Sequence, residues 1–247
     1  MATSPIRCLT KATNVTNEQT CLATKLLSFM QLSELELGCL AALQTNFVSV
    51  QSGAEISYEG QTNHLAYIIQ SGWGCSFKML PDGDRQIITF PVPGDCVGLR
   101  SILLRSSDHS FSALTDLTLS AIEAPRMMST LAEFPRLGSA ILWAVSRDEA
   151  MIVEHLVSIG RRSAIERTAH FFLELYERLL LVGLARDDTF DCPLTQYVLA
   201  DALGLSAIHV NRTLRQLREL ELMTVKDKHV VIHNVDGLKE LAGYGHA

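Results

Sequence analysis

Residues 194–220, LTQYVLADALGLSAIHVNRTLRQLREL, predict two short helices joined by a tight turn. Thr195 can cap the first helix, because its hydroxyl can accept a free amide hydrogen of the first turn. Gly204 follows that helix at once, and glycine suits the position past a helix C-terminus that needs a positive φ. Ser206 can cap the second helix in the same way as Thr195.

The second helix has the features of a DNA-recognition helix. It is expected over about residues 207–220, after a first helix over residues 196–203. Val210, Leu214 and Leu217 recur at helical spacing, so they should share one buried face. Such a helix fits the major groove of double-stranded DNA, with its N-terminal residues nearest the base edges. The candidate DNA contacts on it are Ser206, Ala207, Ile208, His209, Asn211, Arg212 and Arg215.

Residues 223–234, MTVKDKHVVIHN, alternate like two short strands around a basic tip. Lys226 and Lys228 at that tip are further candidate DNA contacts, because a hairpin of this kind can lie along the phosphate backbone. A helix-turn-helix with such a wing predicts sequence-specific DNA binding. The alternative from these residues alone is a plain helical hairpin with a solvated arginine face.

The composition of the chain restricts its possible domain organisation, binding partners and location. The chain has 247 residues, 47% of them hydrophobic, which is enough for two small domains with a core. Its net charge of −6 neither supports nor excludes DNA binding, because lysine and arginine residues can gather locally on the recognition helix and wing. No apolar run reaches the ~18–20 residues of a membrane-spanning helix. Residues 1–24 are polar, lack a secretory signal and are expected to be flexible, and the expected location is the cytoplasm.

From Phe47 to Ile122 the hydrophobic pattern has the period of β-strands. The segments FVSVQ, LAYIIQSG, CSFKML, RQIITF and DLTLSAI are separated by turn signals such as Ser71-Gly72 and Pro93-Gly94-Asp95. Many short strands at this spacing predict a jelly-roll sandwich or barrel. Residues 26–43 before it and residues 134–160 after it have helical patterns.

Residues 65–99, LAYIIQSGWGCSFKMLPDGDRQIITFPVPGDCVGL, resemble the effector-domain signature of the Crp/Fnr family of bacterial transcription regulators. The shared pattern is a strand that ends in a small residue and glycine, a hairpin, a strand with RQI, and then PGD-x-x-G. A strand within residues 111–122, the long helix and the winged helix-turn-helix follow in the family's order. The resemblance covers about residues 25–240.

The resemblance implies an α+β protein: a cyclic-nucleotide-binding-like β-barrel over residues 25–133, a dimerisation helix over 134–160, and a winged helix-turn-helix domain over 161–247. It implies a homodimeric regulator, not an enzyme, that binds palindromic promoter DNA and works with RNA polymerase. The long helix itself can be written with a heptad seam of Leu142, Val145, Glu149, Ile152, Leu156 and Ile159. Gly160 is a candidate hinge at its end. The alternative is a helix buried within one subunit.

The candidate effector pocket consists of Gly98, Leu99, Arg100, Ser110 and Ser112. Cyclic-AMP receptors of the family carry a ribose-binding Glu where Leu99 stands. They carry an Arg-Ser pair for the phosphate near the position of Asp108, and a carboxylate there would repel a phosphate. The usual cyclic-nucleotide chemistry is therefore not expected.

No cofactor and no metal site are expected. The cysteines Cys8, Cys21, Cys39, Cys75, Cys96 and Cys192 are scattered, and Ser120 stands near the barrel cysteine of the iron–sulfur members. A haem sensor that uses His64, His109 or His155, or a redox sensor that uses Cys96, is the alternative. Ile208 stands where the family commonly has a base-reading Glu, so the half-site should depart from the usual consensus.

Two other classes of function compete with the regulator. A cupin-like metalloenzyme would need closely spaced barrel histidines, and no His-x-His pair occurs in the barrel region. A dimeric interaction module without DNA recognition would have no need of the caps, Gly204 and Arg212.

Overall fold

The structure is a computed structural model that describes residues 20–62 and 65–245. Most of the expected flexible segment, residues 1–24, lies outside the described residues. The described residues form two compact units, which we call the sensor unit (residues 20–62, 65–78 and 90–147) and the reader unit (residues 79–89 and 148–245). The tip of one hairpin thus belongs to the same unit as the C-terminal part of the chain.

Two antiparallel four-stranded sheets are formed by the first eight strands, in the orders β1-β8-β3-β6 and β2-β7-β4-β5. The strands are β1 (Phe47–Val50), β2 (Glu55–Ser57), β3 (Leu65–Ser71), β4 (Gly74–Met79), β5 (Arg85–Thr89), β6 (Cys96–Val97), β7 (Ser110–Ala113) and β8 (Leu117–Glu123). All five strand segments predicted from alternation are present. The predicted strand within residues 111–122 is two strands, because residues 114–116 turn between β7 and β8.

Apolar side chains of both sheets fill the space between them. Tyr67 pairs with Ala121 and Ile69 with Leu119 along the β3–β8 ladder, and all four side chains are buried. Phe111 of β7 joins the same cluster. This double-sheet core is the jelly roll that the spacing of short strands predicted.

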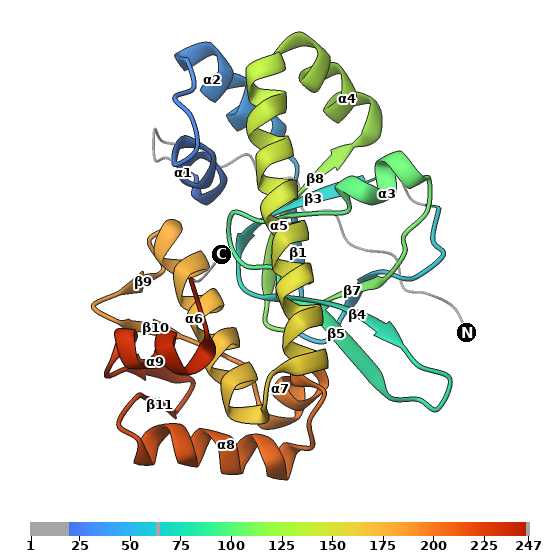
Figure 1. Ribbon diagram of the computed structural model, residues 1–247. Helices are drawn as coiled ribbons and strands as arrows, with labels where there is room; N and C mark the ends of the chain where they lie inside the picture. The colour runs from blue at the N-terminus through green and yellow to red at the C-terminus, as the bar shows by residue number, and fades with distance from the viewer. Residues whose placement is uncertain (1–19, 63–64, 246–247) are drawn as a thin grey trace. The chain divides into compact units, whose positions relative to one another are not determined.

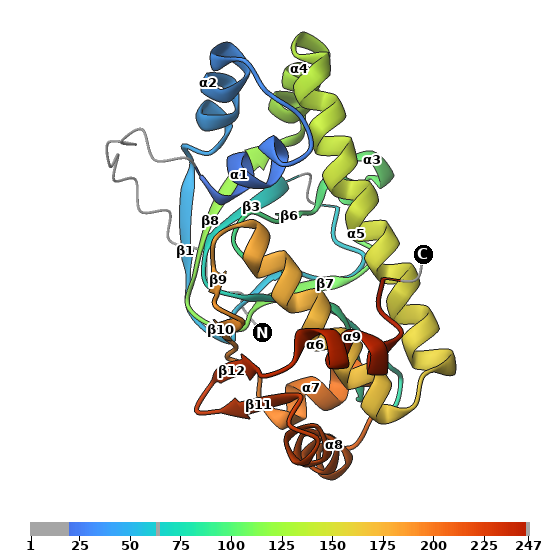
Figure 2. The same ribbon diagram turned by 60° about the vertical axis from the view of Figure 1, so that its left-hand side comes forward.

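Helices of the sensor unit pack on a second core. They are α1 (Cys21–Leu27), α2 (Glu34–Leu43), α3 (Leu99–Leu104), α4 (Ala124–Glu133) and the first part of α5 (Pro135–Arg161). The predicted helix over residues 26–43 is two helices, because Ser33 starts α2 with a reciprocal capping box to Glu36. Figure 2 shows α1 beside strands β8 and β3, and Leu40 of α2 belongs to the same buried cluster as Ala66 of β3 and Ile122 of β8.

The reader unit contains α6 (Ala164–Leu181), α7 (Gln196–Leu203), α8 (Ala207–Glu219) and α9 (Val235–Ala242). Its own sheet has the order β11-β12-β10-β9, with β9 (Ala185–Arg186), β10 (Thr189–Asp191), β11 (Met223–Lys226) and β12 (His229–Ile232). Helix α5 continues through Gly160 to Arg161, so the connection to α6 is Arg162 and Ser163. Ser163 caps α6 through a capping box with Glu166.

The turn between β3 and β4 leaves no room for a side chain at Gly72. A Cβ at Gly72 would lie 2.1 Å from the carbonyl oxygen of Asp116, and its φ is +82°. Gly53 has a similar φ of +84° but no atom within 4 Å of the same position. We expect Gly53→Ala to cost about 1–3 kcal/mol from backbone strain alone, and Gly72→Ala to cost clearly more. Urea unfolding monitored by tryptophan fluorescence measures both, and equal losses would contradict the packing account.

Candidate DNA interface

The helix-turn-helix is formed by α7, a tight turn and α8, as residues 194–220 predicted (Figure 1). The Thr195 hydroxyl accepts from the amide of Val198 at 3.3 Å, and the Ser206 hydroxyl accepts from the amide of His209 at 3.2 Å. Gly204 has φ +62° and ψ +42°, the left-handed conformation that ends α7. Thr195, Gly204 and Ser206 therefore have the cap and turn roles that the sequence predicted for them.

One face of α8 is buried and the opposite face is exposed. Val210, Thr213 and Leu217 are the buried positions, whereas Leu214 is only half-buried. The expected buried face was therefore wrong at Leu214. Thr213 takes its place because its hydroxyl donates to the carbonyl of His209 at 2.9 Å, which satisfies the only polar group of that side chain.

The exposed face of α8 carries most of the candidate base-reading residues. Ile208 is 85% exposed, and Asn211, Arg212 and Arg215 are exposed as well. The Arg212 guanidinium donates to the imidazole Nε2 of His209 at 2.9 Å. Arg215 forms an ion pair with Glu219 one turn later, at 2.7 Å. The face thus combines an apolar side chain, an amide and two guanidinium groups within one helix.

Sequence reasoning overlooked the start of α7. Gln196 accepts a hydrogen bond from the side-chain amide of Asn211 at 3.2 Å, which orients Asn211 on α8. Tyr197 is 76% exposed on the same turn. Their position directly after the Thr195 cap was a usable signal, because the first turn of a helix has free backbone amides that can meet a phosphate.

The predicted wing is the hairpin of β11 and β12. Lys226 pairs with His229 across a turn in which Asp227 (φ +51°) and Lys228 (φ +63°) are both left-handed. Two consecutive positive φ values define the tight turn that matches the twist of a two-stranded hairpin. Both lysine side chains are exposed, so the tip has the basic character expected for a phosphate contact.

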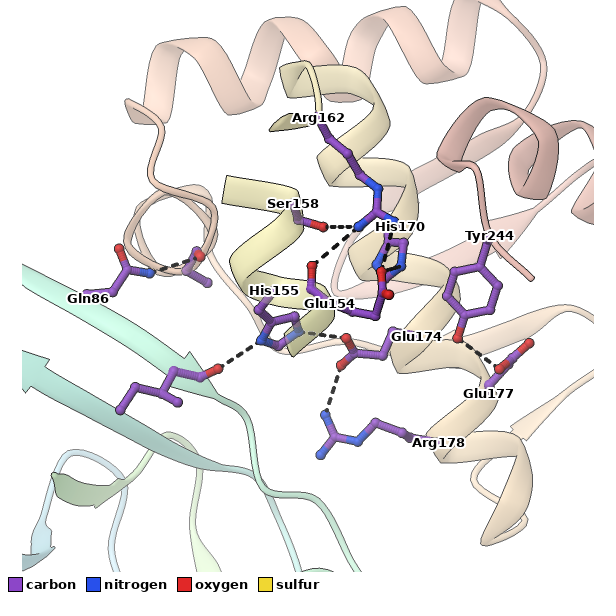
Figure 3. A network of polar contacts seen from close by, with 12 residues as sticks. Gln86, Glu154, His155, Ser158, Arg162, His170, Glu174, Glu177, Arg178 and Tyr244 are labelled. Carbon is purple, nitrogen blue, oxygen red and sulfur yellow. Dashed lines mark hydrogen bonds and ion pairs between the residues drawn. The ribbon is translucent and has the colours of Figure 1, made fainter. Parts of the chain in front are cut away.

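A polar network supports the reader unit where the second part of α5 meets α6 (Figure 3). The imidazole of His155 contacts the carboxylate of Glu174 at 2.6 Å and the carbonyl oxygen of Ile88 at 3.1 Å. Glu154 of α5 binds Arg162 at 2.8 Å and lies 3.3 Å from His170. His155, named as an alternative haem ligand, therefore already has two protein partners.

The pKa values of the two histidines in this network shift in opposite directions. Burial is the largest influence on the pKa of His155 and lowers it, but the hydrogen bond and charge of Glu174 outweigh burial and raise the pKa above 6.5. Burial, together with the charge of Arg162, lowers the pKa of His170. Relative to a free imidazole, the fold therefore favours the protonated form of His155 and the neutral form of His170.

In the sensor unit, the effector-pocket candidates lie on α3 and β7. Gly98 has φ +85° at the start of α3, where Leu99 and Arg100 follow. The Arg100 guanidinium binds Asp108 at 2.5 Å. Ser110 and Ser112 lie on β7, and the buried Ser110 hydroxyl accepts from the amide of Glu59 at 3.2 Å.

Asp108 binds both neighbouring side chains, those of Arg100 and His109. Its second carboxylate oxygen contacts the imidazole of His109 at 2.8 Å. Burial is the largest influence and raises the pKa of Asp108, but the charges of His109 and Arg100 outweigh it and hold the pKa below its ordinary range. The cation that could have met a ligand phosphate is thus paired with a carboxylate of the chain itself.

The other residues considered for an iron–sulfur cluster, haem or redox sensing are placed as follows. Ser120 is buried on β8, and its hydroxyl donates to the carbonyl of Gln44 at 2.9 Å. Cys96 begins β6 opposite Ile68. His64 and Cys8 lie outside the described residues. Within residues 20–62 and 65–245, no three His, Cys, Asp or Glu side chains gather as metal ligands, and no helix is long and apolar enough to span a membrane.

A jelly-roll domain followed by a long helix and a winged helix-turn-helix defines a class of DNA-binding regulators with a sensor domain. Comparison with known protein families agrees with this class. Residues 47–134 match the cyclic nucleotide-binding domain, and residues 166–241 match the Crp-like helix-turn-helix domain.

Individual relatives specify the family. The chain is 31% identical to the nitrogen fixation regulation protein FixK of Rhizobium meliloti (strain 1021), over 72% of this chain and 78% of FixK. It is 34% identical to FixK of Bradyrhizobium diazoefficiens, over 69% of this chain and 70% of that protein. The structure of FixK2 from Bradyrhizobium japonicum superimposes with a TM-score of 0.72 at 26% identity, covering 81% of this chain and 98% of FixK2. The chain belongs to the Crp/Fnr family, and it is a DNA-binding transcription regulator rather than an enzyme.

The contact between His155 and Glu174 predicts a pH-dependent contribution to stability. Because the pKa of His155 is raised in the fold, its contribution is complete below the unfolded pKa of about 6.5 and is lost as pH rises through the folded pKa. The free energy of unfolding of the wild type, minus that of His155→Gln, should therefore be largest at low pH. Urea unfolding from about pH 5 to pH 9 measures this difference. The trend should be lost or reversed in a Glu174→Gln background, because burial then dominates and lowers the pKa of His155, and a wild-type difference that grows with pH would contradict the assignment.

Proposed function

We propose that two copies of the chain pair along α5 and read a palindromic promoter site, with one half-site for each α8. The observation that carries this proposal is the exposed face of α8, where Ile208, Asn211, Arg212 and Arg215 lie on a helix capped at its start by Ser206. Recognition helices of a two-fold dimer about 34 Å apart suit two half-sites one DNA turn apart.

Exposed apolar side chains on α5 support the dimer. Leu142 is 65% exposed and Leu156 is 72% exposed, and Ile152 and Ile159 of the heptad seam are exposed too. Val145 is half-buried and Glu149 is exposed within the same seam. A row of large apolar side chains along one helix is typical of a surface covered by a partner. Ile141 and Ala144 lie on the opposite face and are buried in the sensor core.

Base reading is assigned to the N-terminal half of α8. A guanidinium suits the O6 and N7 acceptors of guanine, so Arg212 reads a guanine. An isoleucine cannot accept a hydrogen bond from cytosine N4, but it can contact a thymine methyl group, so Ile208 reads a different base pair from the family's Glu. Ser206, Ala207, His209 and Arg215 contact flanking bases or phosphates, and Lys226 and Lys228 of the wing bind phosphates.

The signal that reaches the sensor unit is not a cyclic nucleotide bound in the family's usual way. Leu99 offers no hydrogen bond to a ribose, and the ion pair between Arg100 and Asp108 leaves a carboxylate near the phosphate position. No cofactor is assigned, and haem is the alternative. The protein acts in the cytoplasm, where it meets chromosomal DNA and RNA polymerase.

Selection from a random-sequence duplex pool by the full-length protein tests the proposal. The expected result is a palindrome with a guanine in each half-site. A thymine should appear at the position where a family Glu would accept a hydrogen bond from cytosine. Failure to enrich any duplex would overturn the DNA-binding proposal and would favour a dimeric interaction module.

Arg212 and Lys226 should affect binding in different ways. Arg212→Ala should cost about 1–3 kcal/mol and relax specificity at one base pair, because it removes a base contact. Lys226→Ala should weaken all sequences alike and reduce the salt slope by about 1, because it removes a phosphate contact. Gel shifts on the selected duplex and on single-base variants, at several salt concentrations, distinguish the two. Unchanged binding in both variants would contradict the reader assignment.

Leu156→Glu should break the dimer, because each copy would bring a carboxylate into an apolar seam. We expect dimerisation to weaken at least about 100-fold, or ~2.7 kcal/mol, in sedimentation equilibrium. Met128→Glu is the matched control, because Met128 is 46% exposed on α4 and lies outside the seam. A Leu156→Glu variant as dimeric as this control would place the dimer contact elsewhere.

A further inference from the structure

Arg167, one turn into α6, binds four backbone carbonyls with a single guanidinium. Its Nε donates to the carbonyl of Ser158 at 2.9 Å. Its Nη2 donates to the carbonyls of Ile159 at 2.9 Å and Arg162 at 3.2 Å. Its Nη1 donates to the carbonyl of Leu203 at 2.5 Å. Three of these oxygens belong to the end of α5 and the connection after it, and the fourth belongs to the end of α7.

Three of the four oxygens, those of Ser158, Ile159 and Leu203, belong to the ends of helices, and the Ser158 oxygen also accepts from the amide of Arg162. The last carbonyls of a helix have no partner within the helix, and they carry the negative end of its dipole. Ser158 and Ile159 are in the last turn of α5, and Leu203 is the final residue of α7. Arginine suits such a cluster because its planar fork carries five donors and keeps its charge.

This arrangement connects two helices with different tasks. Helix α5 carries the exposed seam, whereas Leu203 directly precedes the Gly204 turn that leads into α8. A rotation of the helix-turn-helix relative to the end of α5 would have to break the bond to Leu203 or the bonds to the α5 carbonyls. One side chain therefore fixes the angle between the two.

We propose that Arg167 is a positioning residue for DNA reading, which sets the separation of the two recognition helices in the dimer by joining the end of α5 to the end of α7. The proposal rests on the proposed function above, because the separation has meaning only for a dimer on two half-sites. It assigns no DNA contact to Arg167 itself.

The preference of the protein for one half-site spacing depends on the positions of the two recognition helices, so this preference is what the experiment measures. The probes are the palindromic duplex recovered by the random-pool selection and two derivatives with one base pair added to or removed from the spacer. One base pair moves a half-site by about 3.4 Å and turns it around the helix axis. Wild-type protein should prefer the selected spacer. In Arg167→Ala this preference should fall about tenfold, the effect of losing the one charge-assisted hydrogen bond, to Leu203, that joins the end of α7 to Arg167.

Two further variants complete the experiment. Arg167→Lys keeps the charge without the planar fork, so it should show a smaller relaxation of the preference and serves if Arg167→Ala does not fold. Arg186→Ala is the matched control, because it also removes an arginine of the reader unit, one whose side chain is 90% exposed beside Asp187. The control should keep the wild-type preference.

The outcomes separate the two proposals. Wild-type protein that binds no duplex defeats the proposed function itself. Wild-type protein that binds without a spacer preference overturns the role of Arg167. Folded Arg167 variants that lose affinity equally for all three spacers, or that keep the wild-type ratio, show that Arg167 stabilises the fold only, and they also overturn the proposal.

Discussion

The carbonyl oxygens at the ends of α5 and α7 must find donors outside their own helices, and the reader unit depends on how this need is met. Arg167 supplies donors to both ends. Gly204 and Leu205 then return their amides to the carbonyl of Ala200, so the chain can reverse within a few residues and start α8. A recognition helix can present defined side chains to DNA only if this turn has one conformation, and these hydrogen bonds give it one.

In the sensor unit, charge compensation within the chain works against the binding of a ligand phosphate. Arg100 is the one cation among the residues proposed for the effector pocket. Asp108 binds that cation and contacts His109, so the charge of Arg100 is compensated within the chain. A ligand phosphate would have to displace the half-buried carboxylate of Asp108 from Arg100, and this raises the cost of binding. The fold of the sensor is thus retained while its electrostatics differ from those of a cyclic-nucleotide receptor.

Local chemistry explains which features could be predicted from sequence. Thr195, Gly204 and Ser206 act within three or four residues, so their caps and turn were evident from spacing alone. Thr213 replaced Leu214 on the buried face because packing against other helices decides burial, and helical periodicity gives only an approximate face. Arg167 had no sequence signal, since its bond to Leu203 joins residues 36 positions apart. The pairing of Arg100 with Asp108 depended in the same way on the loop before β7.

The last turn of α7 is also held by β5, since Arg85 binds the carboxylate of Asp201 at 2.6 Å and Gln86 donates to the carbonyl of Ala202 at 3.1 Å. The reader unit is therefore assembled from two separate stretches of the gene (Figure 1). A recombination event that exchanges everything after residue 147 would bring in a foreign α7 but keep the resident hairpin. Such an exchange preserves the ion pair only if the incoming segment has an acid at position 201. The hairpin and α7 should consequently change together in evolution, although three strands of the jelly roll and the long helix lie between them in the sequence.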